Sequence, residues 1–278
     1  MCKRNVLTSD DFVRWADRIR PSWDFDHTGA PVLVHRKMWE WLLITQALFE
    51  RGMLQPGRAG LGFGVGQEPL VALFASLGCT VLATDMPADR AREIGWTSDG
   101  QFATDRDCLN KYGLCDPADF QERVSLRTVD MNAIPRDLGG FDFTWSSCAF
   151  EHLGSIDAGL RFVARQMRCL VPGGVSVHTT ELNLSSNDET VDEAGTVLYR
   201  ERDLRRLARR LRMRGHKIEL DFEPGQTADD RHVDVPPFSN VHLRTKVQDH
   251  VTTSYGLIIE KRRILANRTT SSRRSDRR

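Results

Sequence analysis

Four glycines occupy every second position from Gly60 to Gly66, between an apolar lead-in and a run with helical periodicity. Pro69, directly ahead of that run, suits the first turn of a helix. The apolar residues that recur at helical spacing are Leu70, Leu73, Phe74 and Leu77. Glycine turns sharply and lets a ligand approach the backbone. Glycines at a junction between strand and helix are therefore typical of doubly wound α/β folds, which bind nucleotides there.

The register of the glycines bears on which nucleotide is bound. The dinucleotide fingerprint G-x-G-x-x-G requires its third glycine at Val65, counting from Gly60, or at Gln67, counting from Gly62. Neither position carries a glycine, so the spacing argues against NAD.

Acidic residues follow two of the expected strands. Asp85 ends the apolar stretch 79–84 and comes about twenty positions after the glycines, where a carboxylate can accept hydrogen bonds from ribose hydroxyls. It can also cap a following helix. Asp130 and Met131 close the alternating stretch 124–129. Here the acid can accept from an adenine amino group while the methionine packs on the ring, and a simple Asx turn is the alternative.

Two side chains are candidates for the chemical step. His152 follows the expected turn and strand at 139–147 and can take a proton near neutral pH, or serve a structural role in a helical turn. His178 is the alternative base. Glu181 and Asn183 come at the carboxyl end of the next strand, where they are candidates for holding a polar acceptor or a divalent ion. We assign no residue to a metal site.

The amino-acid composition indicates which classes of partner the protein can bind. The 278 residues are 40% hydrophobic and 28% charged, with a formal net charge of +1, which suits a soluble α/β domain and gives no electrostatic reason to bind nucleic acid or an acidic membrane. Neither a signal-peptide core nor a run long enough to span a bilayer is present, so we expect a cytoplasmic protein. The six scattered cysteines suggest reduced thiols.

The flanking segments differ from the centre of the chain. Residues 1–54 predict a helical cap, broken at Pro21 and Pro31, whose tryptophans either pack in the core or line an acceptor pocket. These tryptophans are Trp15, Trp23, Trp39 and Trp41. Residues 55–261 form the main domain, in which a polar insertion at 229–237 is a candidate cover for the acceptor. Residues 262–278 are rich in arginine, serine and threonine and predict a disordered basic tail.

The order of these signals, with Pro172-Gly173-Gly174 before the fifth expected strand, resembles that of the class I S-adenosylmethionine-dependent methyltransferases. The resemblance covers residues 55–260. It implies a Rossmann-like α/β fold with a seven-stranded sheet and an antiparallel last strand, and S-adenosylmethionine as cofactor. The implied cofactor-binding residues are Gly60, Gly62, Gly64, Asp85, Met86, Asp130, Met131 and Ser146. Many members carry an acid at the position of Gly60, and Glu68 is the candidate to replace its contact with the methionine amino group.

Three longer stretches, 60–75, 130–135 and 179–188, resemble a bacterial subgroup associated with polysaccharide and glycosyl-transfer gene neighbourhoods. This implies a carbohydrate-type hydroxyl acceptor. The expected function is O-methylation of a sugar or related small polar metabolite, with His152 and Glu181 as catalytic residues. N-methylation of a small molecule and a catalytically silent cofactor-binding module are the alternatives.

Overall fold

The computed structural model describes residues 1–19, 35–93, 95–97, 101–239 and 241–263. Its centre is an eight-stranded sheet in the order β3-β2-β1-β4-β5-β8-β6, with β7 paired to β8. The strands are β1 (Ala59–Phe63), β2 (Thr80–Asp85), β3 (Val124–Thr128), β4 (Phe141–Ser147), β5 (Leu170–Asn183), β6 (Lys217–Ile218), β7 (Arg244–Val247) and β8 (His250–Glu260). Strands β1 to β5 run parallel to one another, whereas β8 is antiparallel to β5, β6 and β7. The predicted α/β fold is confirmed, and β7 is a strand that the sequence pattern did not reveal.

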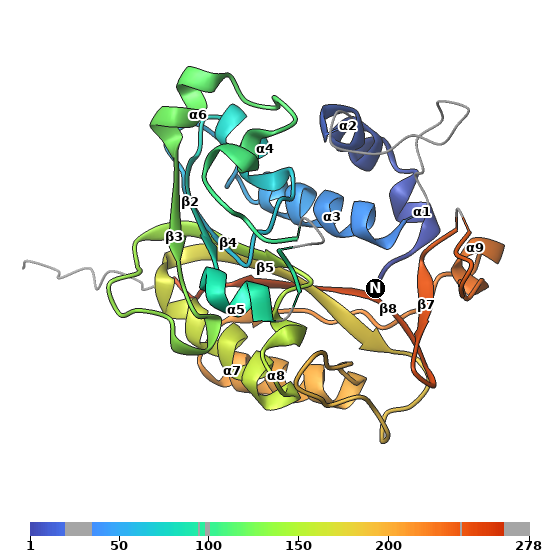
Figure 1. Ribbon diagram of the computed structural model, residues 1–278. Coiled ribbons are helices and arrows are strands. Elements are labelled where there is room, and N and C mark those ends of the chain that lie inside the picture. Colours follow the sequence, from blue (N-terminus) through green and yellow to red (C-terminus); the bar gives the residue numbers. More distant parts are fainter. Residues whose placement is uncertain (20–34, 94, 98–100, 240, 264–278) are drawn as a thin grey trace, which may run out of the picture.

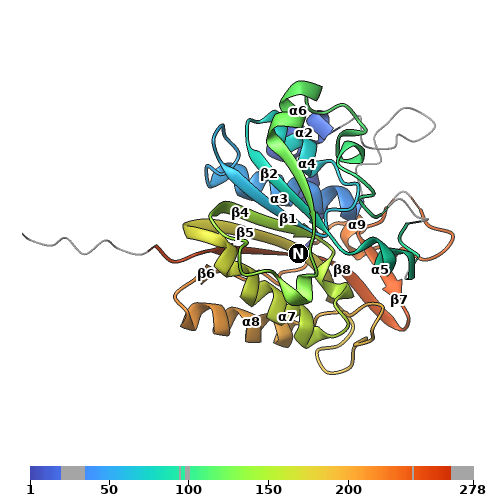
Figure 2. The ribbon, with the colours of Figure 1, turned by 60° about the vertical axis from the view of Figure 1, so that its left-hand side comes forward.

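Helices cover both faces of the sheet. The N-terminal helices are α1 (Arg4–Leu7), α2 (Asp10–Ile19) and α3 (Arg36–Glu50), and the later ones are α4 (Leu70–Ser76), α5 (Ala88–Glu93), α6 (Pro117–Arg123), α7 (Ile156–Gln166), α8 (Glu201–Met213) and α9 (Ala228–Arg231). Helices α3 and α4 lie on one face, and α7 and α8 lie on the other (Figures 1 and 2). In an α/β sheet covered in this way, ligands bind at the carboxyl ends of the parallel strands.

Two hydrophobic clusters fill the spaces between these layers. The first joins the N-terminal helices and α4 to the sheet and includes Trp15, Leu42 and Phe74. The second joins α7 and α8 to the opposite face and includes Phe162 and Leu207. The N-terminal helices therefore share a core with the sheet.

The glycine stretch divides between a strand and a turn. Gly60 and Gly62 lie inside β1, where the rings of Phe143 and Trp145 from β4 occupy the space that a Cβ would need. The turn uses Gly64 and Gly66, whose φ angles are +58° and +52°. The expected junction between strand and helix therefore lies at Gly64 and Gly66, whereas Gly60 and Gly62 stand within β1, where aromatic packing from the neighbouring strand requires glycine.

The described part of the segment 94–123 contains α6. Asp116 caps this helix by accepting hydrogen bonds from the backbone N–H groups of Ala118 and Asp119, and Pro117 occupies its first turn. This cap-and-proline pattern is a helix-start signal that was present in the sequence.

The polar insertion packs against the N-terminus. Asp230 of α9 accepts a hydrogen bond of 2.7 Å from the backbone N–H of Arg4 and is 2% exposed. Helix α9 therefore fastens the start of the chain, which differs from the expected cover over the acceptor.

Some predictions fall outside the described residues. These are the helix breaks at Pro21 and Pro31, the placement of Trp23, and the basic tail from residue 264 onward. Within the described ranges, no helix combines the length and the apolar character needed to cross a membrane. All six cysteines carry free thiols.

We expect Gly60→Ala to lower the free energy of unfolding by about 1–3 kcal/mol, because the new methyl group would overlap the Phe143 ring in a packed core. Urea unfolding followed by circular dichroism measures the change. Gly139→Ala is the matched control, since a Cβ there would have open space, and it should shift stability by about 0.5 kcal/mol at most. Equal effects of the two substitutions would contradict the packing role of Gly60.

Candidate active site

A cavity of about 510 Å³ lies at the carboxyl ends of β1 to β4. It is lined by the turn after β1, the end of β2, the short helix η3 (Met131–Ala133) after β3 and the short helix η4 (Phe150–His152) after β4. The predicted site residues that it brings together are Gly64, Asp85, Met86, Asp130, Met131 and His152. A Cβ at Gly64 would lie 2.9 Å from the Cβ of Ala149, so glycine keeps this part of the cavity open.

Asp85 holds the backbone around this cavity. Its carboxylate accepts hydrogen bonds from the backbone N–H groups of Gly66 (3.0 Å), Ala103 (3.1 Å) and Met86 (2.8 Å). A carboxylate offers about four acceptor positions, so three bonds leave one for a ligand. Burial raises the pKa of Asp85, while the three N–H donors act in the opposite direction. The residue is thus both a structural acceptor and part of the cavity wall.

Asp130 and Met131 line the same cavity from the next strand end. Asp130 is exposed, and its Oδ1 accepts a hydrogen bond of 2.8 Å from the backbone N–H of Asn132, which is the Asx turn that the sequence allowed. Met131 is 8% exposed and packs against the glycine turn. The capping role and a place in the cavity wall coexist at Asp130.

A second cavity of about 320 Å³ lies beside the first, toward α3. The two share four lining residues, Gly64, Trp96, Ala149 and His152. The other residues of its wall are Lys37, Trp41, Val65, Gly66, Gln67, Glu68, Gln101, Lys111, Tyr112, Ser147 and Cys148. Of the tryptophans predicted as core or pocket, Trp41 lines this cavity, whereas Trp15 and Trp39 belong to the hydrophobic core.

His152 stands where the two cavities meet. Its Nδ1 lies 2.8 Å from the carbonyl oxygen of Gly195, and its ring meets the Trp96 ring edge to face at 5.0 Å. Since a carbonyl only accepts, Nδ1 carries the proton of the neutral ring and Nε2 is the acceptor. This tautomer suits a general base.

Two predicted polar residues lie inside the sheet. Ser146 and His178 are both 0% exposed, and the Ser146 Oγ bonds the His178 Nδ1 at 2.8 Å. The other ring nitrogen bonds the Ser176 Oγ at 2.7 Å, and burial lowers the pKa of His178 to about 3. His178 is therefore no base near neutral pH. Because side chains alternate along β4, Trp145 faces α4 while Ser146 faces the opposite layer.

Four of the residues predicted to bind the cofactor or to take part in catalysis are absent from the described walls of both cavities: Gly60, Gly62, Ser146 and Glu181. The strand positions of the first three explain their placement. Gly60 and Gly62 make room for the rings of Phe143 and Trp145, and Ser146 bonds His178 inside the sheet.

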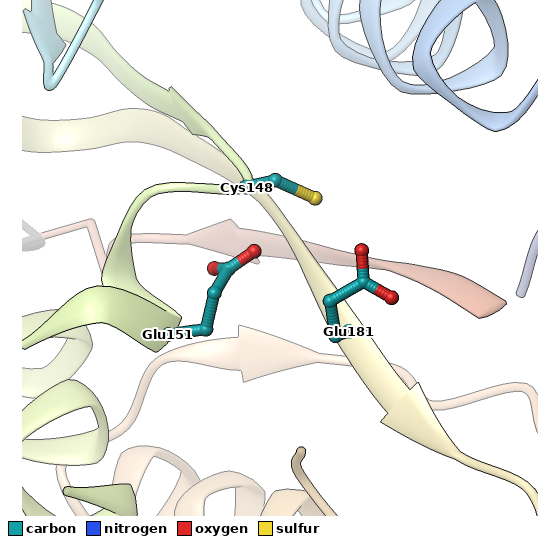
Figure 3. A group of neighbouring side chains, drawn as sticks. All are labelled: Cys148, Glu151 and Glu181. Carbon is teal, nitrogen blue, oxygen red and sulfur yellow. The ribbon is translucent and has the colours of Figure 1, made fainter. Parts of the chain in front are cut away.

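Glu181 is occupied by an ion pair. Its carboxylate pairs with Arg36 at the start of α3 and accepts a hydrogen bond of 2.8 Å from the Thr252 hydroxyl. Figure 3 shows Glu181 beside Cys148 and Glu151. The sulfur of Cys148 and one carboxylate oxygen of each glutamate lie within 4.8 Å of one another. Because Arg36 already balances its charge, Glu181 serves to hold α3 on β5.

A buried carboxylate that the sequence analysis missed ties α3 to the site. Glu40 is 0% exposed and lies 2.7 Å from the Lys37 ammonium. It accepts hydrogen bonds from Ser147 of β4 (3.1 Å) and Ser254 of β8 (2.5 Å). Burial opposes its ionisation, but Lys37 and Arg36, with the hydrogen bonds from Lys37 and Ser254, lower its pKa to about 2. The signal in the sequence was a Lys–Glu pair within a mostly apolar helix.

Glu68, the proposed replacement for an acid at Gly60, lies in the second cavity. Its Oε1 accepts a hydrogen bond of 2.9 Å from the Trp145 indole N–H. Burial raises the pKa of this carboxyl to about 8, against hydrogen bonds from Trp145 and Trp41. The group is therefore mostly neutral at pH 7.

Solved structures share this fold. One, assigned as a sarcosine dimethylglycine methyltransferase from Galdieria sulphuraria, matches with a TM-score of 0.51 and 14% identity over 91% of this chain and 99% of its own. Magnesium protoporphyrin IX methyltransferase (ChlM) from Synechocystis PCC 6803 was solved with bound S-adenosylmethionine. It matches with a TM-score of 0.47 and 13% identity over 93% of this chain and 94% of its own. The first similarity shows that the fold is that of class I methyltransferases. No family model and no curated protein matches the sequence.

The ionised Glu40 makes stability depend on pH. Its folded pKa of about 2 lies below the reference value of 4.5, so it stabilises the fold above pH 4.5, and this contribution of about 3 kcal/mol is lost as pH falls from 4.5 toward 2. We expect the difference in unfolding free energy between wild type and Glu40→Gln to shrink over that window, as measured by urea unfolding from pH 6 to pH 3. Glu122→Gln, at an exposed site, is the control. A difference that stays constant with pH would contradict an ionised Glu40.

Proposed function

We propose that the protein is an S-adenosylmethionine-dependent methyltransferase that acts on a hydroxyl of a small polar acceptor, such as a sugar. The observation that carries this proposal is the pair of adjoining cavities at the carboxyl edge of a class I methyltransferase fold, with His152 at their junction. In this proposal the first cavity takes the nucleoside and the second takes the methionine end and the acceptor.

The first cavity suits a nucleoside in its chemistry. Asp85 has an acceptor position left for a ribose hydroxyl, and Asp130 offers a carboxylate to an amino group. Met86 and Met131 supply apolar surface for a ring. We therefore propose Gly64, Asp85, Met86, Asp130 and Met131 as the cofactor-binding residues.

The second cavity suits a polar acceptor. Trp41, Trp96 and Tyr112 give aromatic surface, and Gln67 and Gln101 add amide groups among charged neighbours. Aromatic rings with convergent polar groups are the mixture that a hydroxylated ring compound requires. This composition supports a sugar-type acceptor.

In this reaction the chain positions the acceptor and removes the proton from its hydroxyl group. The cofactor, when bound, supplies a methyl group already activated on a sulfonium. The cavity walls orient an acceptor oxygen toward it and exclude water. His152 Nε2 takes the hydroxyl proton, while the Nδ1 bond to Gly195 fixes the ring. Glu181 acts indirectly, by holding Arg36 and hence the start of α3 beside the cavity.

The function is tested by incubating the protein with methyl-labelled S-adenosylmethionine and a panel of sugars and amines, and by measuring label transfer and S-adenosylhomocysteine release. We expect label on a hydroxyl compound. Transfer to amines alone would contradict the assigned acceptor.

We expect His152→Ala to lower kcat by about 10²–10⁴-fold, because the base is lost, and to leave the dissociation constant of S-adenosylhomocysteine within about threefold. Steady-state kinetics and calorimetry measure the two quantities. His232→Ala, at a half-exposed histidine beside α9, is the control and should keep full activity. Unchanged kcat in His152→Ala would remove this residue from the mechanism.

A further inference from the structure

Positive charge is concentrated in two stretches of the chain. Residues 200–217 hold eight arginines and one lysine against two acids, and residues 261–278 hold seven arginines and one lysine against one acid. Together the two stretches carry +14, whereas the formal net charge of the whole chain is +1, so all other residues together carry −13. A chain that is nearly neutral as a whole can therefore present a strongly basic surface.

The described parts of these two stretches meet at one edge of the sheet. The first contains α8 and β6, and β6 pairs with the last residues of β8, directly before residues 261–263. The backbone N–H of Arg262 donates a hydrogen bond of 3.4 Å to His216 Nδ1. Burial lowers the pKa of His216, and the nearby cations Lys261, Arg214 and Arg262 lower it further. The end of α8 and the end of β8 thus form one basic surface (Figure 2).

The arginines of α8 differ in their partners along the helix. Those of its first half form ion pairs of 2.6–2.7 Å: Arg202 with Asp188, Arg205 with Glu201, and Arg206 with Asp157. Near its end, Arg212 donates to the carbonyl oxygen of Ile218.

Four exposed arginines around the ends of α8 and β8 have no such partner. Among the residues that the structure describes, no acidic side chain forms an ion pair with Arg210, Arg214, Arg262 or Arg263. We call these four residues the basic patch. Because their charges are not balanced within the protein, the patch attracts an anionic partner.

An exposed apolar side chain adjoins the basic patch. Met213 is 76% exposed, which is the largest exposed fraction among the large hydrophobic residues that the structure describes. Arg210 lies three residues before it, on the same face of α8, and Arg214 follows it directly. Cations beside an exposed apolar side chain are the combination by which proteins bind the surface of an anionic bilayer.

A nucleic acid is the other large anion that could meet such a surface. Proteins that hold single strands offer aromatic side chains on which the bases stack, in addition to cations. The basic patch contains no aromatic residue, and the apolar side chain beside it is Met213. The observations therefore favour a lipid surface over a nucleic acid.

We propose that the basic patch docks on an anionic phospholipid surface, with its guanidinium groups against the headgroups and Met213 entering the interface. The sequence adds five more arginines at 264–278, directly after the patch. The inference is independent of the proposed function. Glu260 pairs with Val175 near the start of β5, so the patch lies at the edge of the sheet opposite to the cavities. Docking therefore leaves the cavities facing solution.

The test is cosedimentation of the full chain with phosphatidylcholine vesicles, prepared with and without about 30% phosphatidylglycerol, at about 0.1 M salt. We expect binding to the anionic vesicles only. The affinity should fall tenfold or more at about 0.5 M salt, because ions screen the attraction between exposed charges.

Two triple variants remove the same charge from the two halves of the basic surface. The first carries Arg210→Gln, Arg214→Gln and Arg262→Gln, and should bind the anionic vesicles about a hundredfold more weakly, since each cation near such a surface strengthens binding about fivefold. The matched control carries Arg202→Gln, Arg205→Gln and Arg206→Gln. It should weaken binding no more than about fivefold, because acids already balance these arginines. Urea unfolding verifies that both variants are folded.

The apolar contribution is tested by Met213→Gln, which should weaken vesicle binding about threefold to tenfold. A single-stranded RNA oligonucleotide is the competing probe. We expect the wild type to bind it more weakly than the anionic vesicles.

Four results would overturn the inference. They are no binding of the wild type to anionic vesicles, equal binding to neutral vesicles, equal weakening by the two triple variants, and an unchanged affinity in Met213→Gln. If the wild type binds the RNA more tightly than the vesicles, the patch is a nucleic-acid surface and the lipid proposal is rejected.

Discussion

The buried carboxylate of Glu40 is the group on which the arrangement of the site depends. It receives hydrogen bonds from Ser147 of β4 and Ser254 of β8 and an ion pair from Lys37 of its own helix. An uncompensated charge at this depth would cost several kcal/mol, so the helix and both strands must meet here. Because α3 is fixed in this way, Arg36 reaches Glu181 and Lys37 reaches the second cavity.

Trp145 takes part both in the packing of the hydrophobic core and in a hydrogen bond at the second cavity. Its ring fills the space above Gly62 and packs edge to face on Phe74 at 5.0 Å, while its indole N–H donates to Glu68 in the cavity. The glycines within β1 thus act on the site indirectly, by admitting the aromatic rings of β4. A larger residue at Gly62 would move the group that orients Glu68.

The sequence predicted the fold well because its signals are local. The glycine turn, the acid at Asp85 and the Asp130-Met131 pair each follow a strand, and parallel strands bring their carboxyl ends to one edge. The roles of Ser146 and Glu181 could not be read in this way, since the face of a strand and a long-range partner such as Arg36 depend on tertiary packing. Distance along the chain also separates Lys37 from Glu68, so their shared cavity appears only in the folded protein.

In the proposed function, the two cavities together bind S-adenosylmethionine. Calorimetric titration of the purified protein with S-adenosylmethionine, and separately with NAD, tests it most directly. We expect saturable binding of one S-adenosylmethionine per chain and no measurable binding of NAD. Tighter binding of NAD, or no binding of S-adenosylmethionine, would contradict the assignment of the cavities and with it the proposed methyltransferase function.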